Sequence, residues 1–200
     1  MPDVGHGHAI HPDSLRDLES SVDRSPAEAL VPRLRQVVAA ANDLLSADGV
    51  GVLLLDEKNL IRTVAATDLA AEALEQVQEH LTVGQGIDAV RWRRTVAITD
   101  LATDLEYRPL WERLADDGVH AVLSAPIWVD GDVVGNLNAL RTAPHAWTAA
   151  QVAGSEAFAG VIGRLLELSA ASARHLPHAV DHSASTHSSR IPLNDRMGEE

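Results

Sequence analysis

The sequence predicts an α+β fold in which helices pack against an antiparallel sheet. Residues 119–140 contain two strand-like runs that are joined by Asp130 and Gly131, a pair suited to a hairpin turn with positive φ. Helical apolar patterns precede and follow this hairpin. The apolar fraction of 46% in 200 residues is sufficient for one globular domain with tails.

The first half of the chain predicts three helices. Ser25 and Pro26 form a helix start, and Pro32 is expected to kink the first turns or move the start to Val31. The apolar stripe of this first helix contains Leu30, Leu34, Val37, Ala41 and Leu44. A second amphipathic helix is predicted over 68–81, and a short third helix over 109–116.

The register of the hairpin decides which side chains share a face. A two-residue turn would pair odd with even positions, whereas a bulge at Gly131 pairs even with even. We favour the bulged register, because it separates an apolar face from a mixed face. The apolar face then contains Ala121, Leu123, Ala125, Ile127, Val133, Gly135, Leu137 and Ala139. The mixed face contains His120, Val122, Ser124, Trp128, Val134, Asn136 and Asn138.

The mixed face has two interpretations. Polar and apolar groups that converge on one sheet face suit a small-molecule pocket. The same pattern also fits an ordinary antiparallel sheet with one half-solvated face. The residues alone leave both interpretations open.

The last helix is predicted from Thr148 to about Ala173. Thr148 and Gln151 can form a capping box, and Trp147 can pack onto Val152 as a hydrophobic staple. Several glycines interrupt its apolar stripe, which indicates close packing against a sheet or a second helix. We assign 25–173 to one domain, 1–24 to a tail with a short helix, and 174–200 to a disordered tail rich in His and Ser.

Charge and composition exclude several functions. The 16 basic and 29 acidic residues give a net charge of −13, which disfavours direct nucleic-acid binding. The absence of cysteine excludes disulfides and thiolate metal sites. The sequence lacks a bilayer-spanning run and a secretory start, so we expect a cytoplasmic protein without a membrane partner.

Histidines provide no convincing metal site. The seven tail histidines would need an ordered tail to hold a metal, and no apolar residues order it, so adventitious binding or none is expected. They are His6, His8, His11, His175, His178, His182 and His187. No catalytic Ser-His-Asp order, phosphate loop or helical metal-ligand pair is present. We therefore expect that the protein is not an enzyme.

Three segments resemble the GAF domain family. Residues 49–66 resemble its first two strands, 83–101 its helical turn and third strand, and 118–151 its C-terminal half. The phrases GVHAVLSAPI and GNLNALRTAP resemble the GAF domains of bacterial antitermination regulators, in which an RNA-binding ANTAR module follows. The helical pattern of an ANTAR module is absent from this sequence. The resemblance covers about residues 30–170.

The resemblance implies an α/β/α-layered fold, with about six antiparallel strands and helices on both faces. It implies a small-molecule sensor in signal transduction or transcriptional regulation, with an unidentified ligand between the sheet and residues 105–117. The expected ligand-binding residues are Trp92, Tyr107, Trp111, His120, Val122, Ser124, Asn136 and Asn138. It also implies a homodimer through the first and last helices, acting through that dimer or a separate effector protein. No cofactor is assigned.

Two alternatives remain open. The domain can be a ligand-free module that dimerises or binds a partner protein. It can also bind haem through His120, as some GAF domains do through a single histidine. Other activities of the family are disfavoured. Bilin attachment and methionine sulfoxide reduction require cysteine, and cyclic-nucleotide binding would require a lysine where Ala139 stands and a phenylalanine where Trp147 stands.

Overall fold

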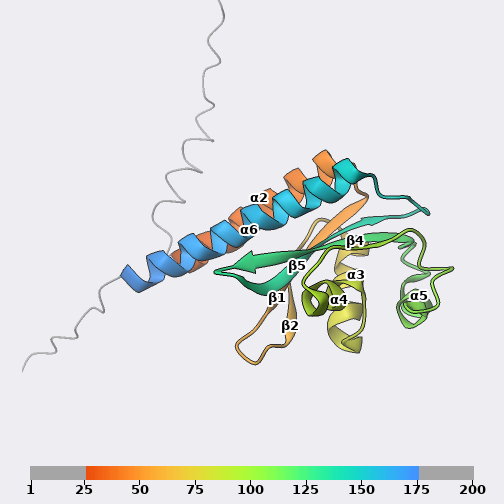
Figure 1. The fold of residues 1–200 in the computed structure, drawn as a ribbon, viewed down its shortest axis with the longest axis horizontal. Coiled ribbons are helices and arrows are strands. Elements are labelled where there is room, and N and C mark those ends of the chain that lie inside the picture. The colour runs from red at the N-terminus through yellow and green to blue at the C-terminus, as the bar shows by residue number, and fades with distance from the viewer. Residues whose placement is uncertain (1–25, 176–200) are drawn as a thin grey trace, which may run out of the picture.

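The computed structural model describes residues 26–175. They form five helices and five strands (Figure 1). In chain order these are α2 (Pro26–Leu45), β1 (Gly49–Leu55), β2 (Ile61–Ala66), α3 (Leu69–Leu81), α4 (Gln85–Trp92), β3 (Val96–Ile98), α5 (Arg108–Leu114), β4 (Ala121–Val129), β5 (Asp132–Arg141) and α6 (Ala149–His175).

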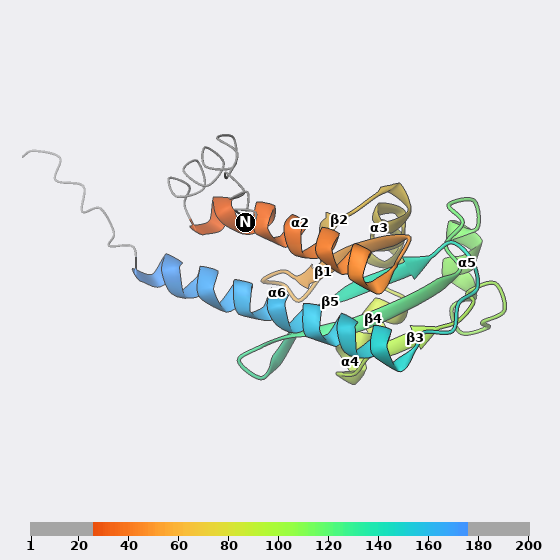
Figure 2. The same ribbon diagram turned by 90° about the horizontal axis from the view of Figure 1, so that it is seen from above.

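The strands form one antiparallel sheet in the order β2-β1-β5-β4-β3. Helices α2 and α6 lie side by side on one face, with α2 over β1 and β2 and α6 over β4 and β5 (Figures 1 and 2). On the other face α3 packs on β1 and β2, and α4 packs on β3, β4 and β5. The predicted α/β/α layering is therefore confirmed.

The sheet has five strands in the described part of the chain, not six. Residues 99–107, between β3 and α5, form turns instead of a further strand. The side chains of Asp100 and Asp104 explain this, because each accepts a hydrogen bond from the backbone N–H two residues later, at 3.1 and 2.9 Å. Such turns compete with strand pairing.

The hairpin has the predicted face separation but a different bulge. Asp130 and Gly131 have φ of 50° and 86°, so they form a two-residue turn with Val129 opposite Asp132. The register shift lies one pair further on, between Ile127 and Trp128, where β5 has an extra residue. Beyond it, even residues pair with even ones, as Ser124 does with Asn138.

The bulge changes the placement of two valines. Val133, predicted on the apolar face, lies opposite Trp128 and outside the cluster under α2 and α6. Val134 packs with the apolar cluster under α2 and α6, although the prediction placed it on the mixed face. The other predicted apolar residues of β4 and β5 largely share that cluster: Leu123, Ala125, Ile127, Leu137 and Ala139. The separation of an apolar from a mixed face holds because the even-with-even register continues through the centre of the hairpin.

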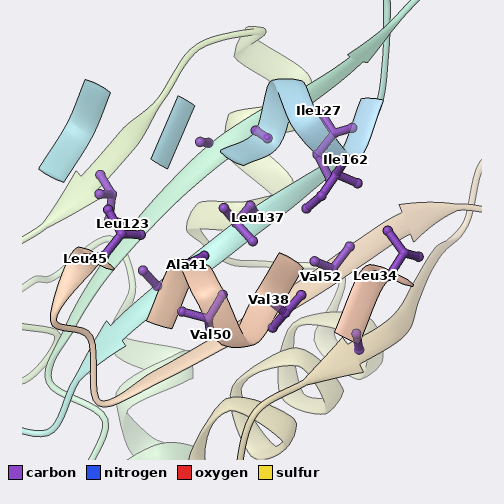
Figure 3. Packing of buried hydrophobic residues seen from close by; sticks show 14 residues of the cluster. Leu34, Val38, Ala41, Leu45, Val50, Val52, Leu123, Ile127, Leu137 and Ile162 are labelled. Atoms are coloured by element: carbon purple, nitrogen blue, oxygen red, sulfur yellow. The ribbon is translucent and has the colours of Figure 1, made fainter. Parts of the chain in front are cut away.

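The apolar core under α2 and α6 is shown in Figure 3. Leu34 and Ala41 of α2 and Ile162 of α6 have no exposed surface and contact β1, β4 and β5 residues such as Val52 and Leu137. The predicted stripe of α2 is correct except at Leu44, which is 75% exposed, and α2 continues through Pro32. Leu45 is buried in place of Leu44.

Helix α6 begins as predicted. The Gln151 N–H donates to Thr148 Oγ1 at 3.2 Å, and the Thr148 N–H donates to Gln151 Oε1 at 3.1 Å, which completes the capping box. Trp147 and Val152 both pack against the core under α2 and α6. No helix within residues 26–175 is both long and apolar enough to span a bilayer. The predicted C-terminal tail was 174–200, but α6 continues through His175. The rest of that tail and the tail 1–24, with the short N-terminal helix and most tail histidines, lie outside the described residues.

Candidate functional site

A buried polar cluster occupies the sheet face opposite α2 and α6. Ser124 of β4 and Asn136 and Asn138 of β5 share this face and are at most 1% exposed. Asn138 Oδ1 accepts hydrogen bonds from the Ser124 hydroxyl and from Asn136 Nδ2, the latter at 2.7 Å. The three predicted side chains are therefore brought together as one hydrogen-bonded group.

Helix α3 completes this cluster with two further polar side chains. Asn138 Nδ2 donates to both carboxyl oxygens of Glu75, at 2.9 and 2.7 Å. Gln78 Nε2 lies 3.3 Å from Glu75 Oε2, and both residues have no exposed surface. The sheet face around Asn138 is therefore covered by α3, and not by the 105–117 segment that the sequence suggested.

Glycines make this close packing possible. A methyl group on Gly51 of β1 would lie 2.2 Å from Glu75 Oε1, and one on Gly86 of α4 would lie 2.7 Å from Asn136 Nδ2. The Gly86 N–H also donates to Gln78 Oε1 at 2.8 Å. A side chain at residue 51 or 86 would therefore displace Glu75, or Asn136 and Gln78, from the positions that form the cluster.

The electrostatics of the cluster depend on Glu75. Burial raises the pKa of the Glu75 carboxyl to about 8, against a smaller opposing effect of its hydrogen bond with Asn138. No Lys, Arg or His within residues 26–175 forms an ion pair with it. Burial without a counter-charge therefore favours the protonated, neutral form of this carboxyl group near pH 7.

Two side chains near this region have polar atoms without partners in the described part of the chain. Asn136 Oδ1 is buried and accepts no hydrogen bond. The side-chain amide of Gln85, which precedes Gly86 at the start of α4, is buried and makes none. Buried polar atoms without a partner are uncommon, because each loses its hydration without compensation. They indicate groups that a polar ligand or water can satisfy.

His120 and Trp111 lie together, outside this cluster. His120 Nδ1 is 2.9 Å from Asp100 Oδ1, and the imidazole centroid is 4.9 Å from the Trp111 ring. This hydrogen bond with His120 is the main reason why the pKa of Asp100 is lowered. A haem ligand needs an apolar slot for the macrocycle, but the His120 side chain is 27% exposed and has an indole beside it. These contacts give no support to a haem site.

Tyr107 borders a small hollow beside α4. Its hydroxyl donates to Asp88 Oδ2 at 2.9 Å, and burial, followed by the hydrogen bond with Asp88, raises the pKa of the phenol. The hollow has a volume of about 210 Å³. It is lined by Thr82, Val83, Gly84, Ile87, Asp88, Arg91, Glu106 and Tyr107.

The two remaining predicted residues have other surroundings. Val122 belongs to the second apolar core, which packs under α3 and α5 with residues such as Leu74 and Leu110. Trp92 is 40% exposed at the end of α4, where the Arg94 guanidinium lies 5.0 Å from its ring. The eight residues that were expected to bind the ligand therefore do not form one site in the structure.

Sequence reasoning missed Glu75 and Gln78, although a signal was present. The buried residues of α3 are Ala71, Leu74, Glu75 and Gln78, which have the spacing of one helix face. Two polar residues within such a stripe indicate either a helix edge or a buried polar contact. Gly51 in the middle of a strand pattern was a second signal, because it indicates close approach by another element.

Comparison with known proteins identifies the family. The GAF domain model matches residues 30–166. The chain belongs to the GAF domain family. No curated protein matches the sequence significantly.

Solved structures of GAF domains are similar to this chain. The GAF3 domain of a Synechocystis protein, in its photoproduct state, superposes with a TM-score of 0.60 at 21% identity and covers 72% of this chain and 98% of its own. The GAF domain of an Acinetobacter phosphoenolpyruvate-protein phosphotransferase has a TM-score of 0.59 at 18% identity, over 81% and 96% of the two chains.

An enzyme has the same fold. The type II free methionine-R-sulfoxide reductase of Thermoplasma acidophilum has a TM-score of 0.52 at 16% identity and covers 70% of this chain and 96% of its own. At these identities the likeness concerns the fold. Membership of the GAF family places the chain among domains typical of sensing and signal transduction.

Proposed function

We propose that this GAF domain is a non-enzymatic small-molecule sensor in bacterial signal transduction or transcriptional regulation. Its ligand would bind at the polar cluster of Glu75, Gln78, Ser124, Asn136 and Asn138. The observation that supports this proposal is the burial of five hydrogen-bonding side chains between one sheet face and α3, together with an Asn136 oxygen that has no partner. A purely structural core would gain more from apolar residues in those positions.

The opposite sheet face suits signal output. Helices α2 and α6 pack directly on β1, β4 and β5, the strands that also carry the polar cluster or contact it. A change in the position of β5 would therefore reach both helices through their shared core. Output would then pass through a dimer or a separate effector protein that contacts α2 and α6.

A thermal-shift screen of metabolites tests the proposed sensing. A ligand that binds only the folded protein raises the melting temperature with its concentration. Ser124→Ala removes one donor to Asn138 Oδ1, which still accepts a hydrogen bond from Asn136, so this variant should fold and respond less strongly. Ser172→Ala, an exposed serine on α6, is the matched control and should respond like the wild type.

Two results would contradict the proposal. One is that no metabolite changes the melting temperature. The other is that a stabilising metabolite acts equally on Ser124→Ala and on the control, because its site would then lie elsewhere.

A ligand-free dimerisation or partner-binding module is the second candidate. It is favoured by apolar side chains that α2 and α6 expose: Val31 (40%), Leu44 (75%), Val161 (46%) and Leu168 (63%). Leu34 and Ala41, from the predicted apolar stripe of α2, and Ile162 of α6 are buried in the monomer core and are not available to an interface. This candidate would be favoured if no metabolite changed the melting temperature and the domain bound a protein partner stably.

A further inference from the structure

The Glu75 carboxyl is buried without a cation. Its hydrogen-bonding partners are the neutral amides of Asn138 and Gln78. The charged residues nearest along α3 do not compensate it, because Glu72 and His80 are exposed and Glu79 binds Arg62 at 2.9 Å. Within the described residues, the acid therefore has hydrogen-bond donors but no counter-charge.

The cluster also has more acceptor than donor capacity. Asn136 Oδ1 has no donor, although the residue has no exposed surface. Once it has lost its proton, the Glu75 carboxylate offers about four acceptor positions, and the donors present use only some of them. A molecule that supplies N–H groups would satisfy these oxygens, whereas one that supplies only acceptors would not.

The hollow beside α4 borders this cluster but does not open into it. Gly84 forms part of its wall, and a methyl group there would lie 2.6 Å from Gln78 Oε1, so the Gln78 side chain lies directly behind that wall. Displacement of this one side chain would connect the hollow with Glu75. Gly84 has φ of 146°, and the preceding Thr82 ends α3 in the left-handed region.

The hollow is predominantly acidic. Asp88 and Glu106 line it, and these two together with Asp104 raise the pKa of Tyr107 through their negative charge. Arg91 is the only cation in the lining; it lies 3.8 Å from Asp88 and its side chain is 70% exposed. A negative approach to a buried acid favours a cation over an anion.

We infer that the cluster recognises a small organic cation with N–H donors, such as an ammonium, amidinium or guanidinium group, which enters from the hollow, displaces the Gln78 amide and pairs with Glu75. The inference rests on the proposed sensing function and names its ligand class. The N–H groups would also reach Asn136 Oδ1. The side-chain amides of Asn136 and Asn138 would hold the other parts of a small polar ligand.

Cation binding would release a proton. The neutral Glu75 carboxyl loses its proton to solvent when the cation arrives, and an ion pair remains in the site. The charged groups that face the route are Asp88, Arg91 and Glu106, which are at the hollow. Well below pH 8, about one proton should leave per bound cation, and calorimetry in two buffers with different ionisation enthalpies measures it.

The experiment compares small probes of similar shape and different charge. Acetamidinium, methylguanidinium and propylammonium are the cations, acetamide and methylurea the neutral probes, and acetate the anion. Binding is followed by NMR through the side-chain amide signals of Gln78, Asn136 and Asn138 in the full chain. We expect the cations to shift these signals at lower concentrations than their neutral counterparts, and acetate to leave them unchanged.

Glu75→Gln removes the acid and keeps a side chain of the same shape. Cation affinity should fall by roughly thirtyfold or more, because the buried partner of the charge is lost. Glu72→Gln makes the same charge change at an exposed position of α3 and should bind like the wild type. A dispersed amide spectrum of Glu75→Gln shows that the variant is folded.

The outcomes separate this inference from the function on which it rests. The cationic ligand class would be overturned if acetamide or acetate bound as tightly as the cations, or if Glu75→Gln still bound the cations with wild-type affinity. Either result would leave the proposed sensing function intact. Binding of Mg²⁺ or Ca²⁺ in place of the organic cations would overturn it too. If no probe affects these amides and the metabolite screen is silent, both proposals fail.

Discussion

At the scale of the residue, Glu75 links the stability of the domain to pH. A carboxyl group without a counter-charge keeps its proton when it is buried, because the ionised form would lose its hydration. Its pKa is raised from 4.5 to about 8 in the folded chain. Between these values the unfolded chain has lost the proton and the folded chain still holds it, so each increase in pH favours unfolding.

The first prediction follows from the direction of this pH dependence, in which stability falls as pH rises. The contribution of Glu75 to the free energy of unfolding should be fully present below about pH 4.5 and be lost as pH rises to about 8. The loss is on the order of 5 kcal/mol. Urea unfolding of the wild type and Glu75→Gln at each pH measures it, since the variant lacks this titration. A constant difference between the two proteins across this range would contradict it.

A second prediction concerns the N-cap of α3, which positions Glu75. Asp68 Oδ1 accepts a hydrogen bond from the Ala71 N–H at 2.9 Å, and its loss in Asp68→Ala should destabilise the domain by about 1 kcal/mol. Denaturant unfolding measures the change. Asp68→Asn keeps an oxygen acceptor and serves as the control. Equal losses in the two variants would show that the charge of Asp68, and not the cap, is what matters.

The polar residues of β4 and β5 were predictable as a group, but their environment was not. Alternation places Ser124, Asn136 and Asn138 on one face, and the structure confirms that they lie together. Whether such a face is open or covered depends on which helix crosses it. That information lies in residues far apart in the sequence, such as Gly51 and Glu75, whose contact no local pattern reveals.

At the scale of the element, the glycines of α6 have different roles. A methyl group on Gly163 would lie 2.2 Å from the carbonyl oxygen of Trp128, a backbone atom that cannot move aside easily. Gly160, one turn earlier, has no atom within 4 Å of that position. The sequence indicated close packing for the glycines of this helix in general, and the structure confines it to particular positions.

These two glycines form a matched pair for the third prediction. Gly163→Ala should destabilise the domain by about 1–3 kcal/mol, because the added methyl group overlaps the β4 backbone. Gly160→Ala should stabilise it by about 0.5–1 kcal/mol through helix propensity. Thermal unfolding of both variants measures the two effects. A similar change in both would show that α6 packs on β4 less closely than the structure indicates.

The hairpin shows how far local rules extend. Asp130-Gly131 correctly indicated the turn, since both residues have positive φ. The bulge lies near Val134, away from the glycine, because the glycine already serves the turn. Both arrangements give the same even-with-even pairing in the centre of the hairpin, so the faces were predicted correctly from an incorrect bulge.

At the scale of the whole molecule, the sheet separates two different interiors. The side under α2 and α6 is apolar, whereas the side under α3 and α4 contains both an apolar core and the polar cluster. The layering was predictable from the amphipathic helices and the resemblance to GAF domains. The apolar stripes that suggested a dimer are mainly used inside the monomer, and only a few outer residues stay available.

The fourth prediction concerns these outer residues. If α2 and α6 form a parallel two-fold bundle with a second copy, light scattering at micromolar concentration should give twice the chain mass of 21.4 kDa. Val161→Glu and Leu168→Glu should each shift the mass towards the monomer, because they place a charge in the interface. Leu105→Glu, at a residue 79% exposed outside these helices, should remain dimeric. A wild-type mass of 21.4 kDa would contradict the bundle.

The antiparallel course of α2 and α6 determines how the domain would bear a mechanical load. Because α2 begins and α6 ends at the same end of the domain, a force applied to Pro26 and His175 would pull the two helices apart from that end (Figure 2). Their contacts would then break one turn at a time, and the hydrogen bonds of the sheet would be loaded only afterwards. In this geometry the helix pair would take the load first, and the sheet with its buried polar cluster would come under tension only after the helices had separated.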